Sequence, residues 1–264
     1  MRNVLAIAWR EIRTYFTSPL AYVVIGVFLC LTGYIFWASL VRFSDLCLRF
    51  GNEPSVFSQL NVNDLVIRPM FGSMAVIFLL MIPAVSMRLL AEERKNGTAE
   101  LLFTCPVTTG QVILGKYLGA TFVLAVMLGL TLAYPLIIMA SDARPDMKPA
   151  LVGYLGILLF GMAGLAVGLL ISSMTENQIV AAVGTFGTLL LLWAIAWVAD
   201  AAAGVKLGIG EATLGDLLNK VSISEHLQDF RKGLLDTEHV VFYLSVVFLF
   251  LFLTQRVVES RKWR

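Results

Sequence analysis

Charged residues are scarce in this chain. Asp, Glu, Lys and Arg make up 14% of its 264 residues and 58% are hydrophobic, whereas a soluble domain carries roughly 25% charged residues. The net charge of +2 is too small to indicate a polyanionic partner such as a nucleic acid. The cysteines, Cys30, Cys47 and Cys105, have no CxxC spacing, so neither a zinc site nor a disulfide framework is indicated. This composition is typical of a polytopic membrane protein.

Long apolar runs are abundant, and each is free of ionisable residues. About 20 apolar residues cross a bilayer core as a helix. The runs do not alternate apolar and polar residues, as strands of a membrane barrel do. The sequence therefore predicts an all-α protein with six transmembrane helices, at 20–41, 69–87, 117–140, 151–173, 178–199 and 240–254, the last extended by its flanks to 237–257.

The charged residues between these runs indicate an orientation. Lys and Arg accumulate on the cytoplasmic side of membrane proteins. The two termini and the loops on their side of the membrane carry a net charge of +5, and the opposite side carries −3. Both termini are therefore predicted to be cytoplasmic.

The N-terminal segment 1–19 has the pattern of an amphipathic helix. At 100° per residue, Leu5, Trp9, Ile12 and Phe16 fall on one face. Ser18-Pro19 ends the helix before the first span. A helix with Trp and Arg suits the membrane–water interface, although a simple charged flank would also orient the first span.

The cytoplasmic segment 88–108 is the most informative stretch. Asn96-Gly97 is a helix stop. Thr98 can then cap a short helix with Glu100 in its first turn, and Pro106 ends it. The helix carries apolar Leu101, Leu102 and Phe103 and is bordered by Glu92, Glu93, Arg94 and Lys95. This arrangement predicts a docking site for a soluble partner; the alternative is a loop helix that rests on the bilayer.

The outer segment 200–239 is too long for a structureless loop. Ser222 and Glu225 have capping-box spacing, and Asp236 can cap the last span. The expected amphipathic or re-entrant helix places its apolar residues at Leu227, Phe230 and Leu234. His226 and His239 are interpreted as solvated or interfacial side chains rather than metal ligands.

Two further patterns involve glycine. The pairs Gly115/Gly119 and Gly164/Gly168 let helices approach closely, and we interpret them as packing within the chain rather than a dimer seam. The run from Gly110 to Lys116 matches GxxxxGK, but Tyr117 stands where a P-loop needs Ser or Thr. With no catalytic constellation either, the sequence predicts no enzyme, cofactor or metal site.

Segment 88–116 resembles the motif of type-2 ABC transporter permeases. Segments 222–236 and 8–11 resemble the stretch before that family's last helix and its elbow helix, so the resemblance covers the whole chain, with the gliding-motility permeases as the nearest subgroup. The motif residues that match are Glu92, Glu93, Arg94, Gly97, Thr98, Glu100, Leu101, Leu102, Pro106, Gly115 and Lys116.

The resemblance implies a single permease domain over 1–264 in a bacterial inner membrane. It would pair with a second permease copy or paralogue. Residues 98–104 would be the coupling helix, docked on a cytoplasmic ATPase subunit that binds ATP and Mg, in a transporter that is an exporter. The alternatives are an ion-coupled secondary transporter or channel, and a membrane scaffold of a motility machine. The substrate is not indicated.

Overall fold

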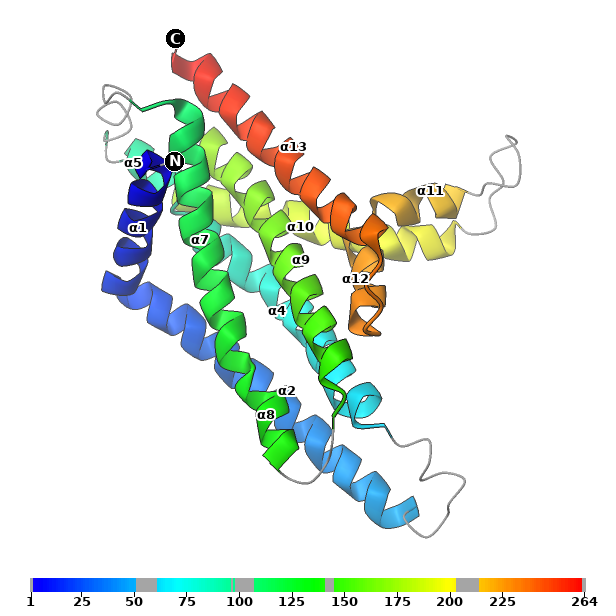
Figure 1. Cartoon of the computed structure of the whole chain (residues 1–264). Coiled ribbons are helices and arrows are strands. Elements are labelled where there is room, and N and C mark those ends of the chain that lie inside the picture. The colour runs from blue at the N-terminus through cyan, green and yellow to red at the C-terminus, as the bar shows by residue number, and fades with distance from the viewer. Residues whose placement is uncertain are drawn as a thin grey trace.

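The computed structural model describes residues 2–50, 61–95, 97, 107–140, 145–202 and 214–262. Within these residues all regular structure is helical and none is strand (Figure 1). Six helical stretches are long and apolar enough to cross a membrane, namely Pro19–Phe50, Asn63–Lys95, Thr109–Ala140, Met147–Met174, Gln178–Ala201 and Thr237–Ser260. The predicted all-α architecture with six membrane-spanning helices is confirmed.

Short connections join consecutive elements wherever the structure describes the whole connection. They are α1 (Arg2–Thr17), α2 (Pro19–Phe50), the π-helix η1 (Asn63–Ile67), α4 (Arg68–Ser86), α5 (Ala91–Lys95), α7 (Thr109–Thr131), α8 (Ala133–Ala140), α9 (Met147–Met174), α10 (Gln178–Ala201), α11 (Leu214–Val221), α12 (Ile223–Arg231) and α13 (Thr237–Lys262).

The helices extend past their predicted limits, and in α7 and α2 polar residues take part in the extension. α7 begins at Thr109 rather than at 117, since Thr108 and Gln111 form a capping box. This earlier start brings Lys116 inside the helix. α2 continues beyond 41 to Phe50, and its last turns contain an ion pair of 2.9 Å between Arg49 and Asp45.

The helices α4 and α9 form the centre of the protein. In their apolar windows 67% and 78% of residues are buried, against 22% or less in α2, α10 and α13. A Cβ atom on Gly164 would lie 2.7 Å from Ile82, and one on Gly168 would clash with Ser86, so these glycines allow α9 to approach α4 closely. The outer helices expose apolar faces, as expected of helices in contact with lipid.

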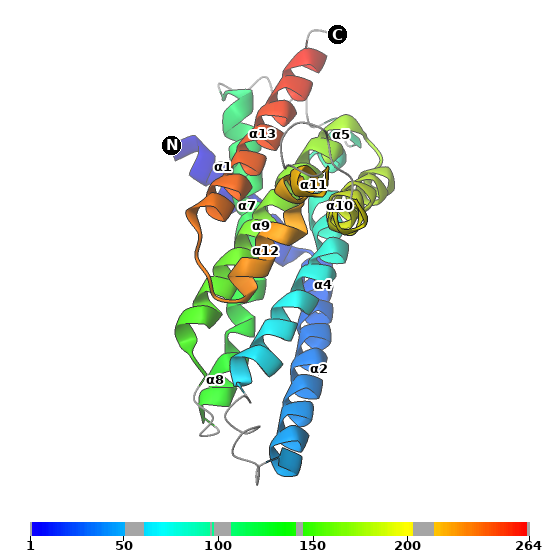
Figure 2. The ribbon, with the colours of Figure 1, turned by 90° about the vertical axis from the view of Figure 1, so that its right-hand side faces the viewer.

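The two chain termini lie at the same end of the bundle, and α8 and the end of α2 lie at the other (Figures 1 and 2). α10 crosses α9 steeply: it lies across the view in Figure 1 and is seen end-on in Figure 2.

The helix α12 confirms most of the pattern predicted for segment 222–236. The Ser222 side chain accepts a hydrogen bond from the Glu225 N–H, and Leu227 and Phe230 are buried. The prediction for Leu234 is wrong, because its side chain is 58% exposed. α12 ends at Arg231, and Gly233, with φ at +82°, turns the chain so that Leu234 leaves the helical face.

Candidate functional site at the base of the coupling segment

The turn between α4 and α5 is fixed to the cytoplasm-proximal end of α9 in the predicted orientation. The Ser172 hydroxyl of α9 donates to the Met87 carbonyl at 3.2 Å. The same oxygen accepts from the backbone N–H groups of Leu90 and Ala91, at 3.2 and 3.1 Å. One buried side chain thus satisfies three backbone groups of the turn, which sets where α5 starts.

α5 ends where the sequence predicts a helix stop. Its last residue is Lys95, and Gly97 has a φ of +66°, a conformation that glycine adopts without strain. The residues Thr98, Glu100, Leu101, Leu102 and Pro106 lie outside the described residues, so the coupling helix over 98–104 stays a prediction. What the structure describes is the part of the chain directly before that segment, α5 and Gly97, which we call the base.

A buried ion cluster connects this base to two other helices. Lys116 of α7 is 2% exposed, and its Nζ lies 2.7 Å from Glu11 Oε1 of α1 and 2.8 Å from Glu93 Oε1 of α5. Arg10 reaches Glu93 at 3.0 Å from the rim of the cluster. Removing charges from water is costly unless they are paired at close range, so buried Lys116 and Glu11, with half-buried Glu93, hold α1, α5 and α7 in one arrangement.

Two glycines of α7 bring α1 close enough for the Glu11–Lys116 contact. A Cβ on Gly115 would lie 2.7 Å from the Ile7 side chain, and one on Gly119 would lie 2.7 Å from Glu11 Cβ. The pair therefore faces α1, which is not one of the membrane spans. Larger side chains at either position would separate the two helices.

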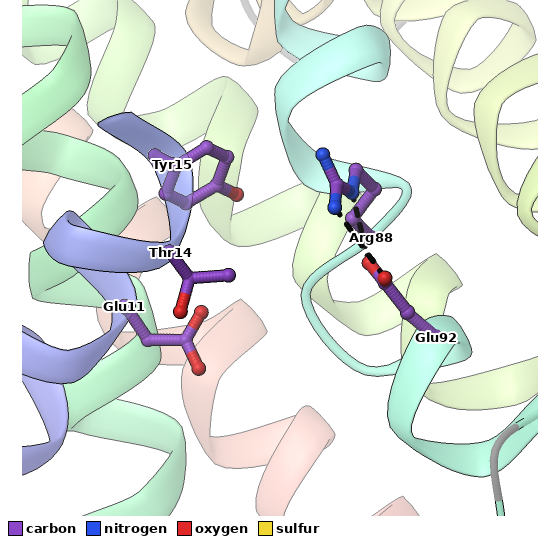
Figure 3. A pocket seen from close by; sticks show the side chains of 5 residues that line it. All are labelled: Glu11, Thr14, Tyr15, Arg88 and Glu92. Carbon is purple, nitrogen blue, oxygen red and sulfur yellow. Dashed lines mark hydrogen bonds and ion pairs between the residues drawn. The ribbon is translucent and has the colours of Figure 1, made fainter. Parts of the chain in front are cut away.

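A small polar pocket lies beside the ion cluster. In Figure 3, Glu11, Thr14 and Tyr15 of α1 face Arg88 and Glu92 across it. Arg88 pairs with Glu92 at 2.8 Å. The cavity measures about 20 Å³, enough for a single water molecule.

Tyr15 and Arg88 also hold α1 against the end of α4. The Tyr15 hydroxyl donates to the Val85 carbonyl at 2.8 Å, and Arg88 donates to the Ser18 hydroxyl at 2.9 Å. Burial, with a further effect of the Glu11 charge, raises the pKa of the Tyr15 phenol. The phenol therefore stays protonated and keeps its role as a donor.

The buried side of α1 is not its apolar face. Leu5 and Trp9 are 66% and 62% exposed, whereas Ala8, Glu11 and Tyr15 are buried. The apolar stripe is thus free to contact lipid, and the face that packs on the protein is the one with Glu11.

The structure brings together residues that the sequence analysis treated separately. Glu92 and Glu93, expected to border a docking helix, pair with Arg88 and Lys116; Arg94 lies on the same short helix. Glu11 and Lys116 each belong to a stretch that resembles a family motif, yet they were not predicted to form a pair. Their opposite charges were the available signal, because an isolated charge next to an apolar run needs a partner.

The described part of the site consists of ion pairs and hydrogen bonds that join helices. No group of three or more His, Cys, Asp or Glu side chains among the described residues could hold a metal ion. The site connects the short helix α5 and the turn before it to three longer helices, α1, α7 and α9.

Fold and site together define a polytopic membrane protein with a buried polar junction beside the turn between α4 and α5. The chain belongs to a family of transporter subunits: the model of the ABC-2 family transporter protein matches residues 5–258. Members of this family are the membrane-spanning permease subunits of ABC transporters and normally work with an ATPase partner. No individual curated protein matches the chain.

Proposed function

We propose that this permease is an exporter subunit of a bacterial inner membrane, driven by a separate ATPase that docks on segment 98–104. The observation that carries the proposal is the ion cluster of Glu11, Glu93 and Lys116. A docking segment can only drive transport if its displacement reaches the spans, and this cluster provides the connection.

The path of transmission runs from α5 to three helices. Glu93 connects α5 to Lys116 of α7, and through Lys116 to α1. Ser172 connects the preceding turn to α9. A movement of α5 would therefore be shared by α1, α7 and α9, since buried packed elements move as units rather than deform continuously.

The orientation that the proposal requires follows from charge. The side of the chain with both termini carries +5 and the other −3, which favours cytoplasmic termini. After replacement of Cys30, Cys47 and Cys105, a cysteine introduced at Lys206 should react with a membrane-impermeant thiol reagent only from outside. Labelling only from the cytoplasmic side would contradict this topology.

A second permease chain completes the proposed transporter. α2 and α10 bury only 22% and 17% of their apolar windows within the chain, which leaves area for a second copy or a paralogue as well as for lipid. Because the chain resembles gliding-motility permeases, the partner ATPase should be sought among the ATPases that work with permeases of that subgroup.

The docking role can be separated from folding by magnitude. Glu100→Lys reverses a charge in the first turn of the predicted helix, which costs roughly 0.3–1 kcal/mol of local stability. At a docked interface the same change costs about 2–5 kcal/mol, if it leaves a buried charge unpaired. Leu101→Asp removes apolar contact area, and Gly97→Val opposes the observed φ of +66°.

The measurement is co-purification of the ATPase encoded with the permease, alongside the melting temperature of each variant. We expect all three variants to lose the ATPase while melting close to the wild type. Asp45→Lys is the matched control, because Asp45 is an exposed acid at the opposite end and its reversal should leave the complex intact. Normal ATPase binding and ATP-dependent transport in all three variants would refute docking, as would transport by the purified chain driven by an ion gradient.

A further inference from the structure

The two histidines of this chain are in direct contact. His226 lies buried on α12, and His239 lies in the first turn of α13. Their Nδ1 atoms are 2.7 Å apart. On the other side of each ring, His226 Nε2 lies 3.1 Å from the Lys220 carbonyl oxygen, and His239 Nε2 lies 3.0 Å from Asp229 Oδ2.

The two outer contacts decide which nitrogens carry hydrogen. A carbonyl oxygen can only accept, so the Nε2 of His226 must donate to Lys220. Asp229 is a carboxylate, because the Lys232 ammonium at 2.9 Å, together with His239, holds the pKa of Asp229 below its usual value. The Nε2 of His239 must therefore also donate. A neutral imidazole carries hydrogen on only one nitrogen, so two neutral rings would face each other with bare Nδ1 lone pairs.

Two lone pairs at 2.7 Å repel, and one proton between them turns the contact into a charge-assisted hydrogen bond. We propose that His226 and His239 form a binding site for a single proton, held between the two Nδ1 atoms as an imidazole–imidazolium pair. The site joins the outer loop helix α12 to the beginning of the last span. It does not depend on the proposed ATPase partner.

The surroundings of the rings favour one positive charge. The His226 ring stacks on Phe242 with centroids 3.8 Å apart and planes 24° apart, and an aromatic face attracts a cation. Asp229 supplies a negative charge at the other end of the pair. The separation of 2.7 Å is that of a hydrogen bond; two ligands of one tetrahedral metal ion at about 2.0–2.1 Å each would stand further apart.

The other charged groups near the pair are occupied or directed to solvent. On α12, Glu225 accepts from Gln228 at 2.7 Å, and Arg231 is directed to the Arg68 carbonyl of α4 at 3.5 Å. Among the ion pairs of the described residues, the one that involves a histidine is that of His239 with Asp229. The exposed charged residues of the neighbouring elements are Lys220 of α11, Lys148 of α9, Asp200 of α10, and Asp236 and Glu238 at the start of α13. On α7, Lys116 is paired with Glu11 and Glu93.

Loss of the proton has a structural consequence. Without it the contact between α12 and α13 becomes repulsive, and the two elements separate at this point. Because the proposed pair can bind its shared proton only where the two rings meet in the folded chain, stability falls as the pH rises.

The chain has only two histidines, which makes a direct test possible with protein that carries no histidine tag. We would label the imidazoles with ¹⁵N and record spectra between about pH 5 and about pH 8, the range in which histidine titrates. The expected spectrum shows both Nε2 atoms protonated, and a single proton shared by the two Nδ1 atoms, at the lower end of this range. Two rings that titrate independently, each with its own tautomer, would overturn the proposal.

Thermal unfolding gives the second readout. Between the lower and the upper end of this pH range, the melting temperature of the wild type should fall by about 3–12 °C more than that of His239→Gln. This difference is the stability that a hydrogen bond to a charged group contributes. Gln at position 239 can donate an N–H to neutral His226, so its contact needs no extra proton. The control Glu225→Gln, on the same helix, should keep the wild-type dependence. Equal pH dependence in the wild type and His239→Gln would refute the site. So would zinc chloride that stabilises the wild type but not His239→Gln, since the pair would then be a metal site.

Discussion

Lys116→Met tests whether the ion cluster holds α1 and α5 on the bundle. Met keeps much of the length and the apolar stem of Lys, and it removes only the ammonium group. Glu11 and Glu93, whose side chains are 11% and 17% exposed, then lose the cation that lies between them.

The expected loss can be worked out from the contacts. Breaking a buried ion pair by removing one partner costs about 3–5 kcal/mol. Glu93 keeps the half-exposed Arg10 at 3.0 Å, which reduces its share of the loss. We therefore expect the lower end of this range, about 3 kcal/mol, which corresponds to a fall in melting temperature of about 6–12 °C for a chain of this length.

The assay is thermal unfolding of the purified permease in detergent, with Arg49→Met as the control. Arg49 and Asp45 form an ion pair with a similar distance of 2.9 Å, but their side chains are 69% and 53% exposed, so the control should lose less than about 1 kcal/mol. The double variant Glu11→Gln/Lys116→Met also removes the acid of α1 that loses its closest cation, with Arg10 left at 3.5 Å. It should lose at least about 1 kcal/mol less than the sum of the single variants.

Two results would refute the reasoning. One is a Lys116→Met protein that melts within about 2 °C of the wild type, which corresponds to under about 1 kcal/mol. The other is strict additivity in the double variant, because independent residues add and coupled residues do not. Either result would mean that Lys116 is not energetically connected to Glu11.

Three further variants test neighbouring features. Gly115→Val should displace α1, because even a Cβ there meets α1 at 2.7 Å, and faster proteolysis of the N-terminal segment would report the displacement. Tyr15→Phe leaves the Val85 carbonyl without its donor and should cost about 1–3 kcal/mol in thermal unfolding; a stability equal to that of the wild type would contradict the contact. Gly233→Ala places a side chain at φ +82° and against Pro149, and we expect it to lower the free energy of unfolding by more than about 1 kcal/mol. A variant as stable as the wild type would contradict this constraint on the turn.

The spans were predictable from the sequence because a bilayer imposes a length and an apolar composition on each helix. The starts and ends were less predictable, since polar residues such as Thr108 and Gln111 extend a helix past its apolar run. Leu234 kept the helical period, but the helix had already ended, and only the φ of Gly233 decides that.

The candidate site was predictable in its parts but not in its assembly. The helix stop at Gly97 can be recognised from local conformational preference. The contact between Glu11 and Lys116 joins residues 105 positions apart, and no local pattern specifies such a pair. The same holds for the histidine pair, since a turn at Gly233 and the packing of α12 on α9 bring its two rings together.

The ion cluster also has a consequence for the order in which the protein is assembled. α1 leaves the ribosome well before α7, because Lys116, the partner of Glu11, follows 105 residues later. At about 5–20 residues per second, α1 waits roughly 5–20 s before Lys116 is made. During that interval its exposed Leu5 and Trp9 can hold it at the membrane surface, with Glu11 still in water. α1 is therefore synthesised before α5 and α7 but can be locked in place only after both have been made.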